Sequence, residues 1–176
     1  ALDSVPRGID SGAIDESFVG TLGVGGRQIG MSGPAVTQHV GLGEVPSVRL
    51  ENACAASGFA VRQAVQAVRS GMVDVALAGG FEVMNDMSRD VARYWLGVSG
   101  EMEWERMAGT TFTGAFAQMA SAHMERYGTT REQLSMVAVK SHRNGARNPH
   151  AHLDFECSIE DAESASVVAA PLTMYH

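Results

Sequence analysis

Residues 47–84 read SVRLENACAASGFAVRQAVQAVRSGMVDVALAGGFEVM, and this stretch decides the fold class of the chain. Residues 46–51 alternate apolar and polar side chains, which predicts a strand. Over residues 54–70 apolar side chains recur at helical spacing, which predicts a helix. Residues 73–80 form an apolar run that ends in two glycines, typical of a strand buried on both faces. Strand, helix and strand with short connections form a βαβ unit, so we expect an α/β fold with a parallel sheet.

The predicted helix carries an apolar stripe that should face the core, and Gly71 should end it. This stripe consists of Phe59, Ala60, Ala64, Ala67 and Val68. Upstream, residues 1–20 predict the end of a helix, a loop and then a strand that closes on Gly20.

Composition and charge narrow the class of protein. The 176 residues are 45% hydrophobic and 19% charged, a mix that suits one folded domain or a domain and a half. The formal net charge of −7, with no basic patch to offset it, argues against nucleic acid or an anionic membrane as partner. We find no apolar run long enough to cross a membrane. The two cysteines lie in different contexts without a secreted-scaffold spacing, which favours reduced thiols and a cytoplasmic location.

Residues 23–43 are rich in glycine and superficially resemble a phosphate-binding loop. They lack the strand–loop–helix frame and the downstream acidic residue of a dinucleotide-binding fingerprint, so we do not expect a nucleotide site. A helix over residues 33–40 fits better, because Pro34 would lie in its first turn and Gly41 would follow its end.

The pattern changes after Met84. Residues 85–111 mix Met, Arg, Glu and Trp without a clean period, so we expect an irregular excursion. Residues 113–127 predict an amphipathic helix, and the spacing of Thr130 and Gln133 matches a capping box at the start of a second helix.

Cys54 is the candidate nucleophile. It follows a predicted strand and lies at the first turn of the predicted helix, where free backbone N–H groups favour thiolate over thiol. The following residues 55–58 are small, so an acyl or pantetheine group could approach the sulfur. A thiolate suits exchange between thioesters, because donor and product are alike. Position alone leaves an equal alternative, a small buried cysteine that only packs in the core.

The same residues resemble the nucleophile region of the thiolase superfamily, closest to the sterol-carrier-protein-type thiolases and the archaeal-type acetyl-CoA acetyltransferases. A later segment, VAVKSHRNGARNPHAHL at 137–153, resembles the family stretch in which His-Arg-Asn precedes Asn-Pro. The related ketoacyl synthases match less well. The matching features near the cysteine are Asn52-x-Cys54, the small residues through Gly58, Ser70-Gly71 and Gly79-Gly80-Phe81-Glu82-x-Met84.

The resemblance implies a thiolase-like layered αβαβα fold, here an incomplete N-terminal half with an inserted helical loop domain. It places the N-terminal core at residues 1–84, the loop domain at 85–170 and the start of the return to the core at 171–176. The family's first strand would precede residue 1. Its second half, with the catalytic histidine and the second, acid–base cysteine, would follow residue 176.

By the same resemblance, Cys54 is the catalytic nucleophile of a thiolase that forms or cleaves 3-ketoacyl-CoA through a cysteine-bound acyl group. Coenzyme A thioesters would be substrates, with no separate cofactor. Phe112, in the stretch GTTFTGAF, is a candidate substrate-binding residue, and a simple core aromatic is an equal interpretation. Glu82 and Met84 would shape the entrance of the loop domain.

Other candidates have simpler interpretations. Cys157 lies among acidic residues that disfavour a thiolate, so we expect a packing role. The histidines at 142, 150 and 152 are close in sequence, but no cysteine or carboxylate ligand set surrounds them, so we expect local hydrogen bonding and no metal site. Arg143 and Arg147 could attract CoA phosphates, or be solvated charges.

Two functions besides thiolase activity stay open from the sequence. One is a thiolase-fold aldolase that cleaves a CoA-bound side chain; the other is a non-catalytic subunit that binds acyl-CoA or lipid. The resemblance also implies a homo-oligomer, and possible partners in a zinc-ribbon/OB-fold protein and a hydroxymethylglutaryl-CoA synthase.

Overall fold

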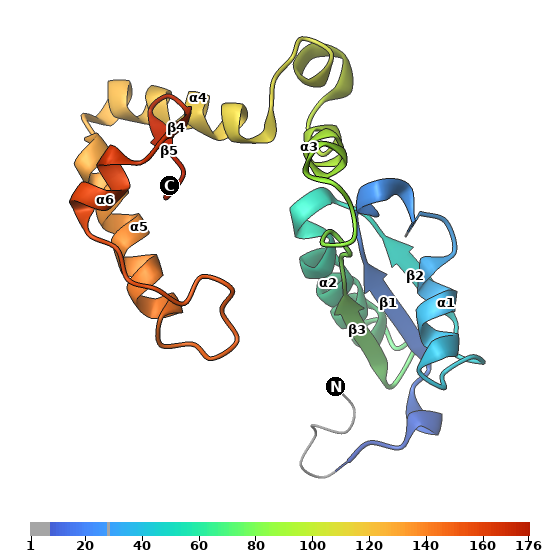
Figure 1. Cartoon of the computed structure of the whole chain (residues 1–176). Helices are drawn as coiled ribbons and strands as arrows, with labels where there is room; N and C mark the ends of the chain where they lie inside the picture. Colours follow the sequence, from blue (N-terminus) through green and yellow to red (C-terminus); the bar gives the residue numbers. More distant parts are fainter. Residues whose placement is uncertain (1–7, 28) are drawn as a thin grey trace. The chain divides into compact units, whose positions relative to one another are not determined.

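The computed structural model describes residues 8–27 and 29–176, and the chain divides into two compact units (Figure 1). The first unit runs through Ser99, and the second runs from Gly100 to His176. The domain boundaries expected from the sequence refer to the complete family fold and stay a prediction. The part of the expected first segment that falls on residues 1–7 lies outside the described residues.

The first unit is built on a three-stranded parallel sheet in the order β2-β1-β3. Its strands are β1 (Glu16–Gly20), β2 (Ser47–Leu50) and β3 (Ala76–Gly80). The central strand β1 pairs with both neighbours, with Phe18 opposite Val48 on one side and Ala78 on the other. The Asp15 carboxylate accepts hydrogen bonds from the Asp74 and Val75 N–H groups, both at 2.9 Å, and so ties the start of β1 to the start of β3. The parallel sheet predicted from the sequence is confirmed.

Helices α1 (Ser32–His39) and α2 (Ala56–Arg69) cover opposite faces of this sheet (Figure 1). The step from β1 to β2 and the step from β2 across β1 to β3 run in opposite directions, so right-handed crossovers place their helices on opposite sides. Phe18 therefore faces α2, while its neighbour Val19 faces α1. Both predicted helices are confirmed.

The core between sheet and α2 depends on one large and several small side chains. Phe18 is 3% exposed and packs against the buried alanines of α2, which are Ala60, Ala64 and Ala67. The expected stripe was partly wrong, because Phe59 and Val68 are each 42% exposed. Each is one residue away from an alanine of this row and therefore lies about 100° around the helix axis from it, on a flank of the helix. Alanine on this face lets α2 approach the strands closely.

Strand β3 differs from the prediction that it is buried on both faces. Its first three residues are half-buried, and Gly79 and Gly80 are exposed. In the described chain β3 is an edge strand, and α1 packs mainly against β2 and β1, so a hollow remains between α1 and β3. The apolar run of a fully buried strand is present, but the described residues cover it from one side.

The segment after Met84 is more ordered than expected. Residues Arg89–Val98 form helix α3 in place of an irregular excursion. Ser88 begins the helix, since its Oγ accepts a hydrogen bond from the Val91 N–H at 3.4 Å. The Trp95 ring packs over Gly26, where an added Cβ would lie 3.2 Å from the indole. A serine cap and a tertiary contact, neither periodic in sequence, produce this helix.

The second unit is mainly helical. It begins with a short π-helical turn (Met102–Arg106), followed by α4 (Phe112–Tyr127), α5 (Arg131–Gly145) and α6 (Ile159–Ser164). Strands β4 (Val167–Ala169) and β5 (Leu172–Thr173) form a small antiparallel pair. The helix predicted over 113–127 and the capping box are both confirmed, because Thr130 and Gln133 exchange hydrogen bonds at 3.0 and 3.2 Å.

A small polar cluster holds the second unit together. Ser135 of α5 is fully buried, and its hydroxyl lies 3.1 Å from His176 Nε2. The Thr173 hydroxyl donates to the Ala162 carbonyl of α6 at 2.7 Å. Burial and the nearby Arg131 guanidinium lower the pKa of His176. The small residues at these positions allow α5, α6 and β5 to meet.

Candidate active site

Cys54 lies at the carboxyl edge of the sheet, in a short 3-10 turn between β2 and α2. This turn, η4, spans Ala53–Ala55, and α2 begins only at Ala56. The sequence had placed the cysteine in the first turn of a continuous helix, and the structure places it one turn earlier. Its thiol is exposed. An exposed side chain at this edge is accessible to a ligand, as ligands commonly bind at the carboxyl ends of parallel strands.

The backbone before Cys54 is strained. Ala53 has φ of +45°, and it is the one non-glycine residue in the described part of the chain with a positive φ. The Glu51 carboxylate accepts a hydrogen bond from the Ala53 N–H at 2.6 Å, and the Ala55 N–H donates to the Asn52 carbonyl at 2.9 Å. Such strain costs about 1–3 kcal/mol and tends to occur where function requires a particular geometry. The strained residue lies where η4 begins, directly before Cys54.

Two glycines seat the start of α2 on the sheet. An added Cβ at Gly20, the end of β1, would lie 2.6 Å from the Ala56 carbonyl carbon and the Ser57 nitrogen. An added Cβ at Gly80, the end of β3, would lie 1.9 Å from Ser57 Oγ and 2.9 Å from the Gly20 oxygen. Real Cβ atoms do not approach so closely, so only glycine fits at these positions. The position of Cys54 therefore depends on both strand ends.

A hollow of about 350 Å³ opens beside Cys54, lined within the first unit. Apolar side chains form most of its wall, namely Leu22, Val24, Phe81, Met84 and Leu96. Small residues, Gly20, Ala53 and Ala56, leave the sulfur accessible from it. Glu82 and Met84, expected at the entrance of a loop domain, belong to this wall. An exposed thiol beside an apolar hollow can accept a group that carries an aliphatic chain.

Residues 21–24 form one side of the hollow, and two charged side chains hold this turn. The Glu82 carboxylate accepts hydrogen bonds from the N–H groups of Leu22, Gly23 and Val24, the shortest being 2.8 Å. On the carbonyl side, the Arg49 guanidinium donates to the oxygens of Thr21 and Leu22 at 3.1 and 3.0 Å. These two residues were missed as a pair from the sequence, because they lie far from the turn along the chain and no local pattern links them.

Phe112 and Cys157 belong to the second unit. Phe112 begins α4, is half-buried, and its ring meets that of Phe116 edge-on at 5.1 Å. Its expected role toward substrate stays a prediction. Burial, and secondarily the Asp161 carboxylate, raises the pKa of the Cys157 thiol. This direction agrees with the packing role expected from the acidic surroundings.

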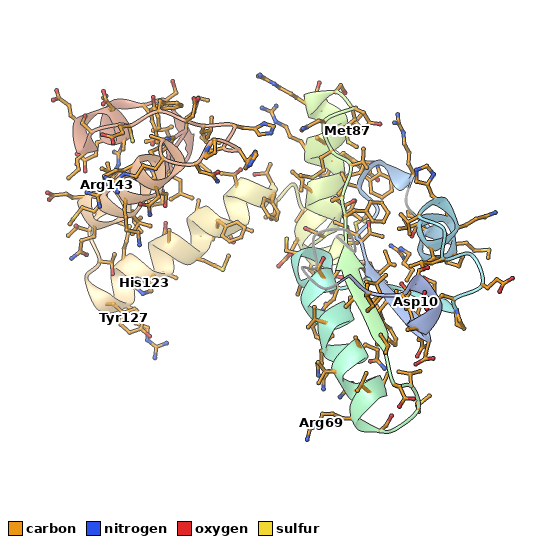
Figure 2. All side chains as sticks on the ribbon, turned by 90° about the horizontal axis from the view of Figure 1, so that it is seen from below. Asp10, Arg69, Met87, His123, Tyr127 and Arg143 are labelled. Atoms are coloured by element: carbon orange, nitrogen blue, oxygen red, sulfur yellow. The ribbon has the colours of Figure 1, made fainter. Side chains whose placement is uncertain are left out.

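The clustered histidines have separate environments. The His142 ring packs against those of Phe155 and Tyr175, with centroids 4.8 and 5.3 Å away. The His150 N–H donates to Asn148 Oδ1 within a turn. Figure 2 shows another ring pair, His123 and Tyr127, along α4, with centroids 4.7 Å apart. Across residues 8–27 and 29–176, no three His, Cys, Asp or Glu side chains are grouped to hold a metal ion.

Arg143 lies exposed on α5 and Arg147 lies exposed just after it (Figure 2 labels the first). Neither forms an ion pair with a carboxylate in the described chain. Both stay candidates for solvated charges or for phosphate contacts. None of the helices in the described residues has the length and apolar character to cross a bilayer.

Comparison with known proteins places these features in one family. The family model described as "Thiolase, N-terminal domain" matches residues 1–169. The acetyl-CoA acetyltransferase of Methanocaldococcus jannaschii is 39% identical over 96% of this chain and 43% of its own length. The acetyl-CoA acetyltransferase of Methanothermobacter thermautotrophicus is 37% identical over 95% of this chain and 43% of its own length. The chain thus spans less than half the length of these relatives.

A solved structure shares the fold. The Ltp2-ChsH2(DUF35) aldolase superposes with a TM-score of 0.68 over 95% of this chain and 42% of its own, at 24% identity. At that identity the likeness concerns the fold alone. Both kinds of comparison agree with the parallel sheet and the helices described above.

Proposed function

The chain belongs to the thiolase family, and on that premise we propose that Cys54 accepts an acyl group from an acyl-CoA thioester. The observation that carries the proposal is the exposed Cys54 thiol, held at the carboxyl edge of the sheet beside an apolar hollow. The names of the two archaeal relatives, both acetyl-CoA acetyltransferases, support acetyl-CoA as one donor. The complete protein would act as an acetyl-CoA C-acyltransferase that forms or cleaves 3-ketoacyl-CoA.

The proposed first step exchanges one thioester for another. The Cys54 thiolate attacks the acyl carbonyl carbon, a carbon–sulfur bond to Cys54 forms, and the bond to the CoA sulfur breaks. CoA leaves as a thiolate that takes up the proton given by Cys54, so atoms and charge balance. Backbone N–H groups near the start of α2 are suited to the oxygen on which negative charge develops.

The second step would need an acid–base group that deprotonates the acceptor acetyl-CoA. By the family resemblance, a histidine and a second cysteine outside these residues supply it. We therefore assign to this chain the acyl-accepting part of the reaction, and the complete reaction to the full-length protein.

Intact-protein mass spectrometry of the full-length protein with acetyl-CoA tests the acyl-accepting role. We expect an acetyl adduct that maps to Cys54 and disappears in Cys54→Ser. Cys157→Ser is the matched control and should retain the adduct. An unacetylated wild-type protein, or an adduct retained in Cys54→Ser, would contradict the proposal.

The assembly and location of the complete protein are also proposals. We propose a cytoplasmic homo-oligomer that can pair with a zinc-ribbon/OB-fold protein or with a hydroxymethylglutaryl-CoA synthase. The name of the aldolase of similar fold, Ltp2-ChsH2(DUF35), joins two components and motivates the search for such a pair. Size-exclusion chromatography with light scattering measures the oligomer, and co-elution with each candidate partner tests the pairing.

A further inference from the structure

The turn at residues 21–24 uses its hydrogen-bond donors internally. Three successive N–H groups and the Thr21 hydroxyl all point to the one Glu82 carboxylate, at distances from 2.8 to 3.4 Å. Gly23 allows this arrangement, because its φ of +85° turns its N–H toward the same side as its neighbours. Successive N–H groups of this kind usually bind an anion. Here Glu82 fills that place, so the turn has no donor left for a substrate.

The opposite side of the turn is held as firmly. Arg49 donates two hydrogen bonds to the carbonyls of Thr21 and Leu22, and it is partly buried on β2. Hydrogen bonds that involve a charged group are stronger than neutral ones. Arg49 lies on the outer strand β2, Glu82 follows the end of the other outer strand, β3, and both hold the turn that follows the central strand.

What the held turn presents to the hollow is apolar. Leu22 and Val24 line the hollow beside Cys54, and the polar backbone between them is bonded to Glu82 and Arg49. A chain attached to the Cys54 sulfur would therefore meet side-chain carbon on this side. Such a wall selects by size and shape, where one methylene changes the rate by about tenfold or more.

We propose that Glu82 and Arg49 are positioning residues that decide which acyl chains Cys54 accepts. They fix Leu22 and Val24 as the wall against the aliphatic part of an acyl-CoA, without touching the reacting atoms. The inference rests on the proposed acyl transfer at Cys54 and adds the residues that set its chain-length preference.

Acyl transfer to Cys54 from two donors tests this inference. In the full-length protein, rates of adduct formation are measured with acetyl-CoA and with hexanoyl-CoA, for wild type, Glu82→Gln and Leu22→Ala. Glu82→Gln keeps the shape of the side chain but replaces one acceptor oxygen with a donor, which breaks the set of bonds to the turn. We expect the hexanoyl-to-acetyl ratio to change by about fivefold or more, in the same direction as in Leu22→Ala.

Two controls separate a positioning role from a general loss of structure. Iodoacetamide is too small to reach the side chains of Leu22 and Val24, so the rate at which it alkylates Cys54 should stay within about twofold of the wild-type rate. Glu44→Gln, a change at another exposed glutamate of the first unit, should leave both the ratio and the alkylation unchanged. Equal losses in both acyl transfers and in alkylation would show that Glu82 is merely structural and would overturn the inference.

The outcomes distinguish this inference from the function it rests on. If wild type forms no adduct with either donor, the proposed acyl transfer fails, and this inference fails with it. If wild type forms adducts and a folded Glu82→Gln keeps the wild-type ratio, only the inference is overturned. Should Glu82→Gln not fold, Thr21→Val removes just the hydroxyl between Glu82 and Gly23, and an unchanged ratio there overturns it equally.

Discussion

The two units of the chain are held together in different ways. In the first, the decisive side-chain hydrogen bonds join segments about sixty residues apart, as between Glu82 and the turn at 22–24 or between Asp15 and Val75. In the second, many such bonds are helix caps between residues three apart, as at Thr111, Thr130 and Ser158, and longer-range bonds such as that between Ser135 and His176 join the helices to the chain end. In the unit that carries Cys54, the residues around the site are themselves held by bonds between distant segments.

This difference suggests where each unit tolerates change. A local cap is lost at the cost of its own hydrogen bond, and its helix can remain. A glycine against which a helix packs, or a buried aromatic ring, is in contact with several elements, so its substitution displaces all of them. We therefore expect larger effects of comparable substitutions in the first unit than in the second.

The largest effect is expected at the one large ring of the first core. Phe18→Ala should lower the free energy of unfolding by about 3–5 kcal/mol, because Phe18 is 3% exposed and a cavity would remain between β1 and α2. Phe116→Ala in α4 is the matched change, since that ring is 49% exposed, and it should cost about 1 kcal/mol. Denaturant unfolding followed by circular dichroism measures both. Similar losses for the two variants would refute the contrast between the units.

The next largest effect is expected where α2 packs on the glycine at the end of β3. Gly80→Ala should destabilise by about 1–3 kcal/mol, because its Cβ would collide with Ser57 Oγ and the Gly20 oxygen. Gly79→Ala is the adjacent control, where an added Cβ meets nothing within 4 Å. That variant should be neutral or slightly stabilising, by about 0.5 kcal/mol, since alanine restricts the unfolded chain. Thermal unfolding of both variants measures the difference. Equal melting temperatures would contradict the claim that α2 packs on the strand ends only because residue 80 is a glycine.

A smaller effect is expected at a cap of the second unit. Thr130→Ala removes the hydroxyl that accepts from the Gln133 N–H at 3.2 Å, and should cost about 1 kcal/mol. Thr130→Ser keeps an oxygen at the same place and should retain most of the stability. Denaturant midpoints of the three proteins measure the difference. If Thr130→Ser were as unstable as Thr130→Ala, the packing of the threonine methyl group, and not the cap, would account for the loss of stability.

The smallest effect is expected in the dependence of stability on pH. Hydrogen bonds from the Ser158 N–H and hydroxyl lower the pKa of Asp161 below its ordinary value. The folded carboxylate resists protonation, so its contribution is complete above the ordinary pKa and is lost as the pH falls through the lowered one. Asp161→Asn does not titrate, and its stability should fall less between pH 6 and pH 2. Unfolding curves across that range test this, and parallel curves for both proteins would exclude the role.

Much of the fold followed from local patterns. The strand–helix–strand order of residues 47–80, the helix before it and the capping box at Thr130 each leave a periodic or spaced signal in the sequence, and the structure contains all of them. Cys54 was identified as a candidate on such grounds too, from its place between a strand and a helix and from the small residues that follow it.

The rest depends on contacts that no local pattern contains. The start of α3 depends on Ser88 and on the packing of Trp95 on Gly26, and the turn at Cys54 begins at Ala53, whose φ is positive. The bonds from Glu82 to the turn at 22–24 join the segments that follow two neighbouring strands, β3 and β1. Exposure of Phe59 was misjudged because periodicity shows that a face is apolar, but does not show what covers it.

Competition between the two cysteines tests the central claim most directly. Within the described residues, Cys54 is exposed at its turn, whereas burial and Asp161 raise the pKa of Cys157. The test uses the folded full-length protein. We predict that iodoacetamide labels Cys54 at least about tenfold faster than Cys157, and that acetyl-CoA slows labelling of Cys54 alone. Residue-resolved mass spectrometry gives both rates. Equal labelling of the two cysteines, or no protection of Cys54 by acetyl-CoA, would contradict the assignment of Cys54 as the acyl acceptor.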